Sequence, residues 1–287
     1  MANLKELRTR ISSISSTMQI TSAMKMVSAA KLKRAQNAIV QLRPYAQKLE
    51  EILVNVSASL DISEGVYTTQ PETTEKVLLV MVSSNRGLCG AFNTNIAKRV
   101  QAYHRDFEGH LDVLSVGKKS HEILHKRKPD INRIDQQGEI FDQLTFERVS
   151  ELAEELMRYY REGTYDKIEL VYNRFKNAAT QYVQVEQFLP IRTPEEGAGE
   201  AGEYIYEPGK EIILEDLIPK SLKTQLFKAL LDSNASEHGA RMTAMHQATD
   251  NAEDLKRELS LEYNKARQAN ITNEILEIVS GAEALDG

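Results

Sequence analysis

The stretch LKELRTRISSISSTMQITSAMKMVSAAKLKRAQNAIVQLRPYAQKLEEILVNVSASL, residues 4–60, repeats mostly apolar side chains at alternating steps of three and four. The stripe consists of Leu4, Leu7, Ile11, Ile14, Met18, Thr21, Lys25, Ser28, Leu32, Ala35, Ile39, Leu42, Ala46, Leu49, Leu53, Val56 and Leu60. A 3.5-residue period sustained for about eight heptads predicts a coiled-coil helix. Such a helix would reach roughly 90 Å at 1.5 Å per residue. We therefore expect it to project from the rest of the chain.

This N-terminal stripe becomes polar at three successive positions, Thr21, Lys25 and Ser28. A polar layer that fixes register, or a local stutter, would explain the change. A surface gripped by an external partner would explain it too, and both interpretations stay open at this stage. Apolar side chains at these turns fall on other faces of the helix: Ile20, Met24, Met26 and Val27.

The middle of the chain, residues 75–205, alternates short apolar runs with helical patterns, which predicts an α/β domain. The expected strands are residues 77–82, 111–116, 168–172 and 182–189, and the expected helices are residues 93–107, 120–128 and 146–161. The run VLLVMV at 77–82 has no polar residue, which is typical of a strand covered by helices on both faces. Turn-forming residues predict loops at three places: residues 61–71, 193–202 and 207–209.

A second long helix is expected from about Glu211 to the C-terminus, because proline is absent after residue 220 and apolar positions recur at helical steps. The recurring positions are Leu231, Ala235, Met242, Met245, Ala248, Ala252, Leu255, Leu259 and Ala266. The predicted fold is an α/β middle domain inserted between two long terminal helices that pair as an antiparallel coiled coil. Its expected parts are residues 1–60, 75–205 and 210–287. A homodimeric coiled coil would bury the same stripes.

Composition bounds the class of protein. The chain has 287 residues, of which 41% are hydrophobic, enough for a normal core. Its longest apolar run, residues 77–82, is far shorter than the roughly 20 residues of a membrane-spanning helix. The N-terminus lacks the apolar region of a secretory signal, so we expect a cytoplasmic protein. Cys89 is the only cysteine, which excludes an intrachain disulfide.

The N-terminal helix is strongly basic, which raises a nucleic-acid hypothesis. Residues 1–49 contain Glu6 as their only acid. The basic residues there are Lys5, Arg8, Arg10, Lys25, Lys31, Lys33, Arg34, Arg43 and Lys48. They are spread around the helix without an aromatic platform for bases, so acidic protein loops or plain solvent are the preferred surroundings.

The sequence HEILH at residues 121–125 matches the H-E-x-x-H pattern of zinc hydrolases, in which His121 and His125 would bind the metal and Glu122 would act as the base. Glu147 or Glu151 could supply a third ligand. Lysines and arginines flank the motif on both sides, and a proline follows it, which makes a poor scaffold for a divalent cation. We therefore favour a solvated surface helix.

The sequence SSNRGLCG at residues 83–90 follows a predicted buried strand and precedes a helix, where phosphate-binding loops lie. It lacks the spacing of either glycine-rich phosphate motif, so its glycines are interpreted as turn residues. No histidine in the segment could activate Cys89, and this residue is predicted to be structural.

Several motifs resemble, in order and over the whole chain, the gamma subunit of the rotary F-type ATP synthase. The motifs are ITSAMKMVSAAK at 20–31, SNRGLCG at 84–90, ARMTAM at 240–245, ATDN at 248–251 and ARQANITNEI at 266–275. Asn85 departs from the family, in which Asp is common at this position. Cys89 alone cannot provide the cysteine pair of the chloroplast-type thiol switch.

The resemblance implies a non-catalytic rotor shaft of a proton-translocating ATP synthase, without cofactor or metal, that couples rotation to the catalytic head and regulates ATPase activity and proton flow. The implied partners are the alpha and beta subunits, epsilon and the ring of c subunits, at the cytoplasmic face of the plasma membrane. By motif, the residues that contact a beta subunit are Met24, Lys25, Arg241, Arg267, Gln268 and Thr272. The alternatives are the zinc hydrolase and a basic nucleic-acid-binding coiled coil.

Overall fold

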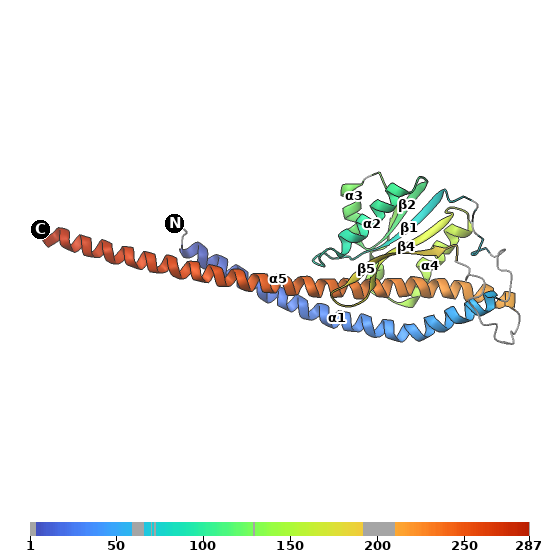
Figure 1. The fold of residues 1–287 in the computed structure, drawn as a ribbon, viewed down its shortest axis with the longest axis horizontal. Helices are drawn as coiled ribbons and strands as arrows, with labels where there is room; N and C mark the ends of the chain where they lie inside the picture. Colours follow the sequence, from blue (N-terminus) through green and yellow to red (C-terminus); the bar gives the residue numbers. More distant parts are fainter. Residues whose placement is uncertain are drawn as a thin grey trace. The chain divides into compact units, whose positions relative to one another are not determined.

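The computed structural model describes residues 4–58, 66–69, 71, 73–128, 130–191 and 210–286 (Figure 1). The chain divides into two compact units, Met1–Val27 with Met242–Gly287, and Ser28–Arg241. Helices α1 (Leu4–Ala58) and α5 (Lys210–Asp286) contribute to both units, and each unit is described by itself. The predicted loops at 61–65, 193–202 and 207–209 lie outside the described residues.

The Ser28–Arg241 unit contains one five-stranded sheet of order β3-β2-β1-β4-β5. The strands are β1 (Lys76–Val82), β2 (His110–Val116), β3 (Asn132–Gln136), β4 (Lys167–Phe175) and β5 (Gln181–Leu189). The helices between them are α2 (Phe92–Asp106), α3 (Lys118–Arg127), the short η2 (Glu139–Phe141) and α4 (Phe146–Arg161). The first four strands are parallel and β5 is antiparallel to β4. The four expected strands are confirmed, whereas β3 was not predicted.

Strand β1 is buried on both sides, as its apolar sequence predicts, because successive side chains point to opposite faces. Val77, Leu79 and Met81 pack against α2 and α3. Leu78, Val80 and Val82 pack against α4 and the part of α5 that belongs to this unit. The sheet therefore lies between two helical layers, and α5 forms part of one of them (Figure 1).

In the other unit, α1 and α5 pair in antiparallel orientation. The Thr249 hydroxyl donates to Thr21 Oγ1 at 2.8 Å, and Lys256 Nζ donates to Ser15 Oγ at 3.4 Å. From the first contact to the second, the residue number falls by six in α1 and rises by seven in α5, so the two helices run antiparallel. The stripe of α1 therefore continues through its polar positions, with Thr21 buried in the pairing surface.

One position of the expected α5 stripe was wrong. Leu255 is 46% exposed, and Lys256 instead continues the stripe toward α1. Steps of three and four from buried Met245 through Thr249 and Ala252 arrive at residue 256, so Leu255 turns to the outer side of the helix.

The remaining part of α1, which belongs to the Ser28–Arg241 unit, buries the next positions of the same stripe. Ser28, Leu32, Ala35 and Leu49 are buried, and Leu53 packs against the core formed with α4 and α5. The expected stripe therefore continues into the second unit. The described part of the helix extends to Ala58, and the last two residues of the predicted helix lie outside the described residues.

Candidate partner-binding sites

The carboxyl ends of β1 and β4 are covered by helix α5. The strand order turns at β1, and open α/β sheets bind ligands outside the carboxyl ends at such a point. Here Ser236 Oγ donates to the carbonyl oxygen of Asn173 in β4 at 2.9 Å. Gly239 lies so close to the turn between β4 and β5 that an added Cβ would be 3.2 Å from the Ala178 carbonyl oxygen. The chain's own helix thus occupies this position.

The loop at residues 84–90 is held by hydrogen bonds from Asn93 of α2 and from Arg241 of α5. Asn93 Oδ1 accepts from the Ser84 backbone N–H at 3.0 Å, and Asn93 Nδ2 donates to Cys89 Sγ at 3.2 Å. Burial raises the pKa of the Cys89 thiol, which supports a structural role. The Arg241 guanidinium donates to the carbonyl oxygens of Arg86 at 3.0 Å and of Gly87 at 3.3 Å.

Arg241 lies in a buried charged cluster on α5. Its Nη1 lies 2.7 Å from Glu237 Oε1, one helical turn away, and the Arg241 residue is only 8% exposed. Burial raises the pKa of Glu237, and the Arg241 charge opposes this effect. Burial lowers the pKa of His238 to about 4, with Arg241 and Lys31 adding to the decrease, so His238 is neutral at pH 7. The predicted contact residue Arg241 is therefore engaged within the chain.

The zinc-hydrolase motif is not assembled into a metal site. His125 Nδ1 lies 3.2 Å from the Arg133 guanidinium, and Glu122 pairs with Lys119 at 2.7 Å. Glu147 and Glu151 belong to α4, which covers the opposite sheet face from α3. Across the described ranges, no cluster of three His, Cys, Asp or Glu could hold a metal ion. The proposed third ligands were therefore wrong.

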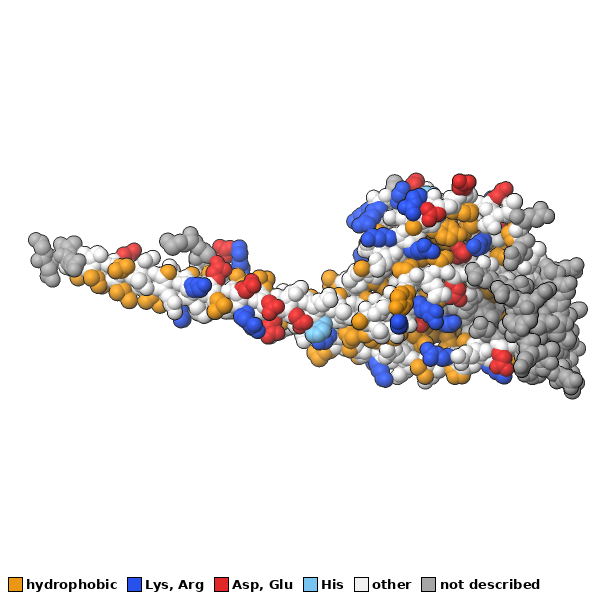
Figure 2. Space-filling model, viewed as in Figure 1, with side chains coloured by type: hydrophobic (Ala, Val, Ile, Leu, Met, Phe, Trp, Pro, Cys, Tyr) orange, Lys and Arg blue, Asp and Glu red, His pale blue; other side chains and the backbone are white. Residues whose placement is uncertain are grey.

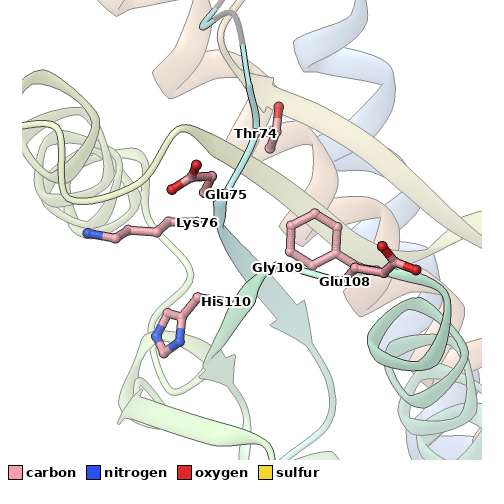
Figure 3. Close-up of a pocket in the computed structure, with 7 residues that line it drawn as sticks. Thr74, Glu75, Lys76, Glu108, Gly109 and His110 are labelled. Atoms are coloured by element: carbon pink, nitrogen blue, oxygen red, sulfur yellow. The ribbon is translucent and has the colours of Figure 1, made fainter.

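A wide pocket lies at the opposite edge of the sheet, where β1 and β2 begin (Figure 3). Its volume is about 530 Å³, and its lining is Thr74, Glu75, Lys76, Phe107, Glu108, Gly109 and His110. The backbone is internally bonded, because the N–H groups of Glu75 and Lys76 donate to Asp166 and the His110 N–H donates to the Glu75 oxygen. The charged side chains that line the pocket include both acids and a lysine (Figure 3). No nucleophilic side chain among them is in contact with a base.

In the paired-helix unit, Lys25 lies beside α5. The Lys25 Nζ is 3.2 Å from His246 Nδ1, and His246 Nδ1 is in turn 3.3 Å from Asp250 Oδ1. Met24 and Lys25 are half-buried. Exposed apolar side chains of α1 accompany them, namely Ile20, Met26 and Val27. This region therefore combines a cation with apolar surface.

The other predicted contact residues lie further along α5. Arg267, Gln268 and Thr272 are exposed, and the Thr272 hydroxyl donates to the Gln268 carbonyl oxygen at 2.9 Å. Arg267 is 21 positions beyond His246, which corresponds to about 30 Å of helix. The structure therefore places these predicted residues at two separate positions along the unit. Every described residue from 267 to 282 is exposed, including Ile271, Ile275, Leu276, Ile278 and Val279.

Sequence reasoning missed the partners of these residues. Glu237 precedes Arg241 by one helical turn, a spacing that signals an intrahelical ion pair but does not indicate whether the pair faces inward. His246 and Asp250 have the same spacing. No local pattern indicates that the Arg86 and Gly87 carbonyl oxygens accept from Arg241, because these contacts join distant segments.

Comparison with known proteins gives the same assignment over the whole chain. A family model described as ATP synthase matches residues 3–285. An ATP synthase gamma chain from Flavobacterium johnsoniae is 60% identical over 290 residues, covering 100% of both chains. A chain in the central stalk and c-ring of the Tetrahymena thermophila mitochondrial enzyme is 26% identical with a TM-score of 0.60, covering 80% of this chain and 99% of that one. A Euglena gracilis chain from an OSCP/F1/c-ring structure is 22% identical with a TM-score of 0.69, covering 98% and 94%.

Two long terminal helices around a mixed α/β domain define a central-stalk protein of a rotary machine. The chain belongs to the ATP synthase gamma chain family, whose members are non-catalytic subunits of the complex. In the part of the chain that the structure describes, no helix is long and apolar enough to span a membrane.

Proposed function

We propose that this subunit transmits rotation of a membrane ring to the catalytic beta subunits of a proton-translocating ATP synthase, and that it regulates ATPase activity and proton flow. Its partners in this proposal are alpha, beta and epsilon subunits and a ring of c subunits. Its location is the cytoplasmic face of the plasma membrane, where it is held through the complex. The similarity to a chain in the central stalk and c-ring of the Tetrahymena thermophila enzyme supports this assembly.

The observation that carries the proposal is the exposed C-terminal part of α5. Beyond Ala266 the described side chains of α5 are exposed through residue 282, and large apolar groups are among them. An exposed apolar surface of this kind marks a protein contact. A sleeve formed by the alpha and beta subunits would remove these side chains from water.

Two positions on the paired helices are proposed to contact a beta subunit. Lys25 and Met24 form one, where a cationic group adjoins apolar surface. Arg267, Gln268 and Thr272 form the other, where a planar guanidinium and neutral donors suit a carboxylate loop. The contact of Arg241 with a beta subunit stays a prediction, and within the chain its guanidinium donates to the loop at residues 84–90.

Coupling in this proposal follows from differential binding. A single shaft presents different side chains in different directions, so each orientation would favour a different state of a surrounding beta subunit. A shift between states requires such a difference in binding free energy.

The test is charge reversal in the assembled complex. Arg267→Glu should lower ATP turnover or its coupling to proton transport more than Arg267→Ala, because it places like charges against an acidic loop. The matched control is Arg257→Glu, the same charge change at another exposed position of α5. Equal activity of wild type, both Arg267 variants and the control in fully assembled complexes would refute this contact.

A further inference from the structure

A cationic cavity lies on the α2 and α3 layer of the sheet. Its volume is about 380 Å³, within the usual range of small-molecule sites. Its lining is Lys98, Gln101, Ala102, His104, Arg105 and Lys128. Lys and Arg side chains gather on the corner of the domain where α2 and α3 lie (Figure 2).

The charge of the cavity comes from two elements. Lys98 and Arg105 lie seven residues apart on α2, on one side of the helix, and Lys128 follows the end of α3. Two carboxylates lie nearby and are more than half exposed. Asp106 accepts from Arg105 at 3.0 Å and Asp130 lies 3.3 Å from His104. The lining itself contains three permanent cations and no acid.

An unsatisfied donor accompanies these cations. Gln101 Nε2 is buried, and it has no hydrogen-bond partner in the part of the chain that the structure describes. A buried polar group left without a partner costs about 1–3 kcal/mol. This donor is out of contact with solvent, so it belongs to the wall of the cavity, and the binding of an anion would rest on the exposed cations.

Helix dipoles explain only part of this arrangement. His104 and Arg105 lie in the last turn of α2, where cations are favourable, and Lys128 caps α3. Lys98 lies in the middle of α2, so the dipole gives no reason for it. The backbone N–H groups of Phe107 and Lys128 already donate to carbonyl oxygens at the two helix ends.

We propose that this cavity binds a small molecule carrying two or more phosphoryl groups. Two or three closely spaced negative charges match three cations better than a single carboxylate does, and phosphoryl oxygens accept from both lysine and arginine. The lining has no Phe, Tyr or Trp side chain on which a base could stack, so we expect the phosphoryl groups to provide most of the recognition.

The experiment is calorimetric titration of the full-length chain with inorganic pyrophosphate and, separately, with ADP. Both should bind, with affinities within about threefold, and Lys98→Ala/Lys128→Ala should weaken both by about tenfold or more. The matched control is Lys33→Ala/Arg34→Ala, which removes the same charge from exposed positions of α1. Circular dichroism should show both double variants to be folded.

Three results would overturn the proposal. One is an absence of pyrophosphate and ADP binding at millimolar concentration, which would leave the basic corner to an acidic protein partner. Another is equal weakening in the cavity and control variants, which would mean general charge attraction. The third is preference for ADP by about tenfold or more, which would mean recognition of the base.

Discussion

Arg241 of α5 donates to the carbonyl oxygen of Arg86 at 3.0 Å and so joins the C-terminal helix to the loop that follows β1. The same guanidinium pairs with Glu237 in a site from which water is almost excluded. A site that would hold a ligand in other open α/β sheets is therefore used here to fix the helix to the domain.

Arg241→Ala should destabilise the chain by about 3–5 kcal/mol, because Glu237 would remain buried without its cation. Arg241→Lys should cost less, since it keeps the charge and loses the planar fork. Urea unfolding measures both. Arg241→Ala/Glu237→Ala should be less destabilised than the sum of the single variants. Additive losses would show that the two side chains are not coupled.

Leu32→Asp should destabilise the chain by several kcal/mol, because Leu32 is 6% exposed in the stripe of α1 and the carboxylate would be buried without a partner. Leu42→Asp should cost less, since Leu42 is only half-buried. Ile20→Asp is the control, at a position of α1 that is 60% exposed. Thermal unfolding should separate the three variants in that order, and equal melting temperatures would refute the stripe assignment.

Asp232→Asn should stabilise the chain increasingly as pH rises from 4 to 7. Burial raises the pKa of Asp232 to about 6, although Lys228 and Arg174 oppose the increase. An acid with a raised folded pKa stabilises the fold below its unfolded pKa of about 4 and loses that contribution as pH rises through about 6. Relative to wild type, the variant should therefore gain up to about 3 kcal/mol near pH 7, measured by urea unfolding.

His238→Gln should change stability relative to wild type with the opposite pH dependence. The folded pKa of His238 is about 4, so the wild type loses stability as pH falls from the unfolded value of about 6.5 toward 4. Removing the imidazole should therefore raise stability relative to wild type at low pH and have less effect at pH 7. Relative stabilities that change with pH in the same direction for the two variants would contradict at least one of these assignments.

Most of the helices and strands could be predicted because they have a strong local signal. The apolar run of β1 and the heptad stripe of α1 each indicate the type of element and which of its side chains are buried. Strand β3, NRIDQ, carries no such signal, because it is a mostly polar edge strand that pairs with β2 alone. Its pairing is irregular next to Val113, and only the neighbouring strand makes it extended.

The site was less predictable than the fold. Motif resemblance selects Arg241 and Arg267 alike, yet Arg241 is buried against a loop and Arg267 is exposed. The difference depends on where a helix face meets a distant segment, which no spacing within α5 encodes. Thr21 is a buried polar position paired with Thr249, in agreement with the polar layer that was one of the interpretations left open by the sequence.

Ile275→Ser/Ile278→Ser should leave the stability of the isolated chain within about half a kcal/mol of wild type, because surface substitutions rarely exceed that. Both side chains are more than half exposed in the described structure, so folding does not bury them. In the assembled ATP synthase, the double variant should weaken retention of the subunit, since a surrounding sleeve would lose two buried apolar contacts. Gel filtration after mild salt or detergent stress measures retention, and Glu274→Ser/Glu277→Ser, at exposed acidic positions of the same helix segment, is the matched control. Retention equal to wild type in the isoleucine variant would show that no sleeve encloses this part of α5.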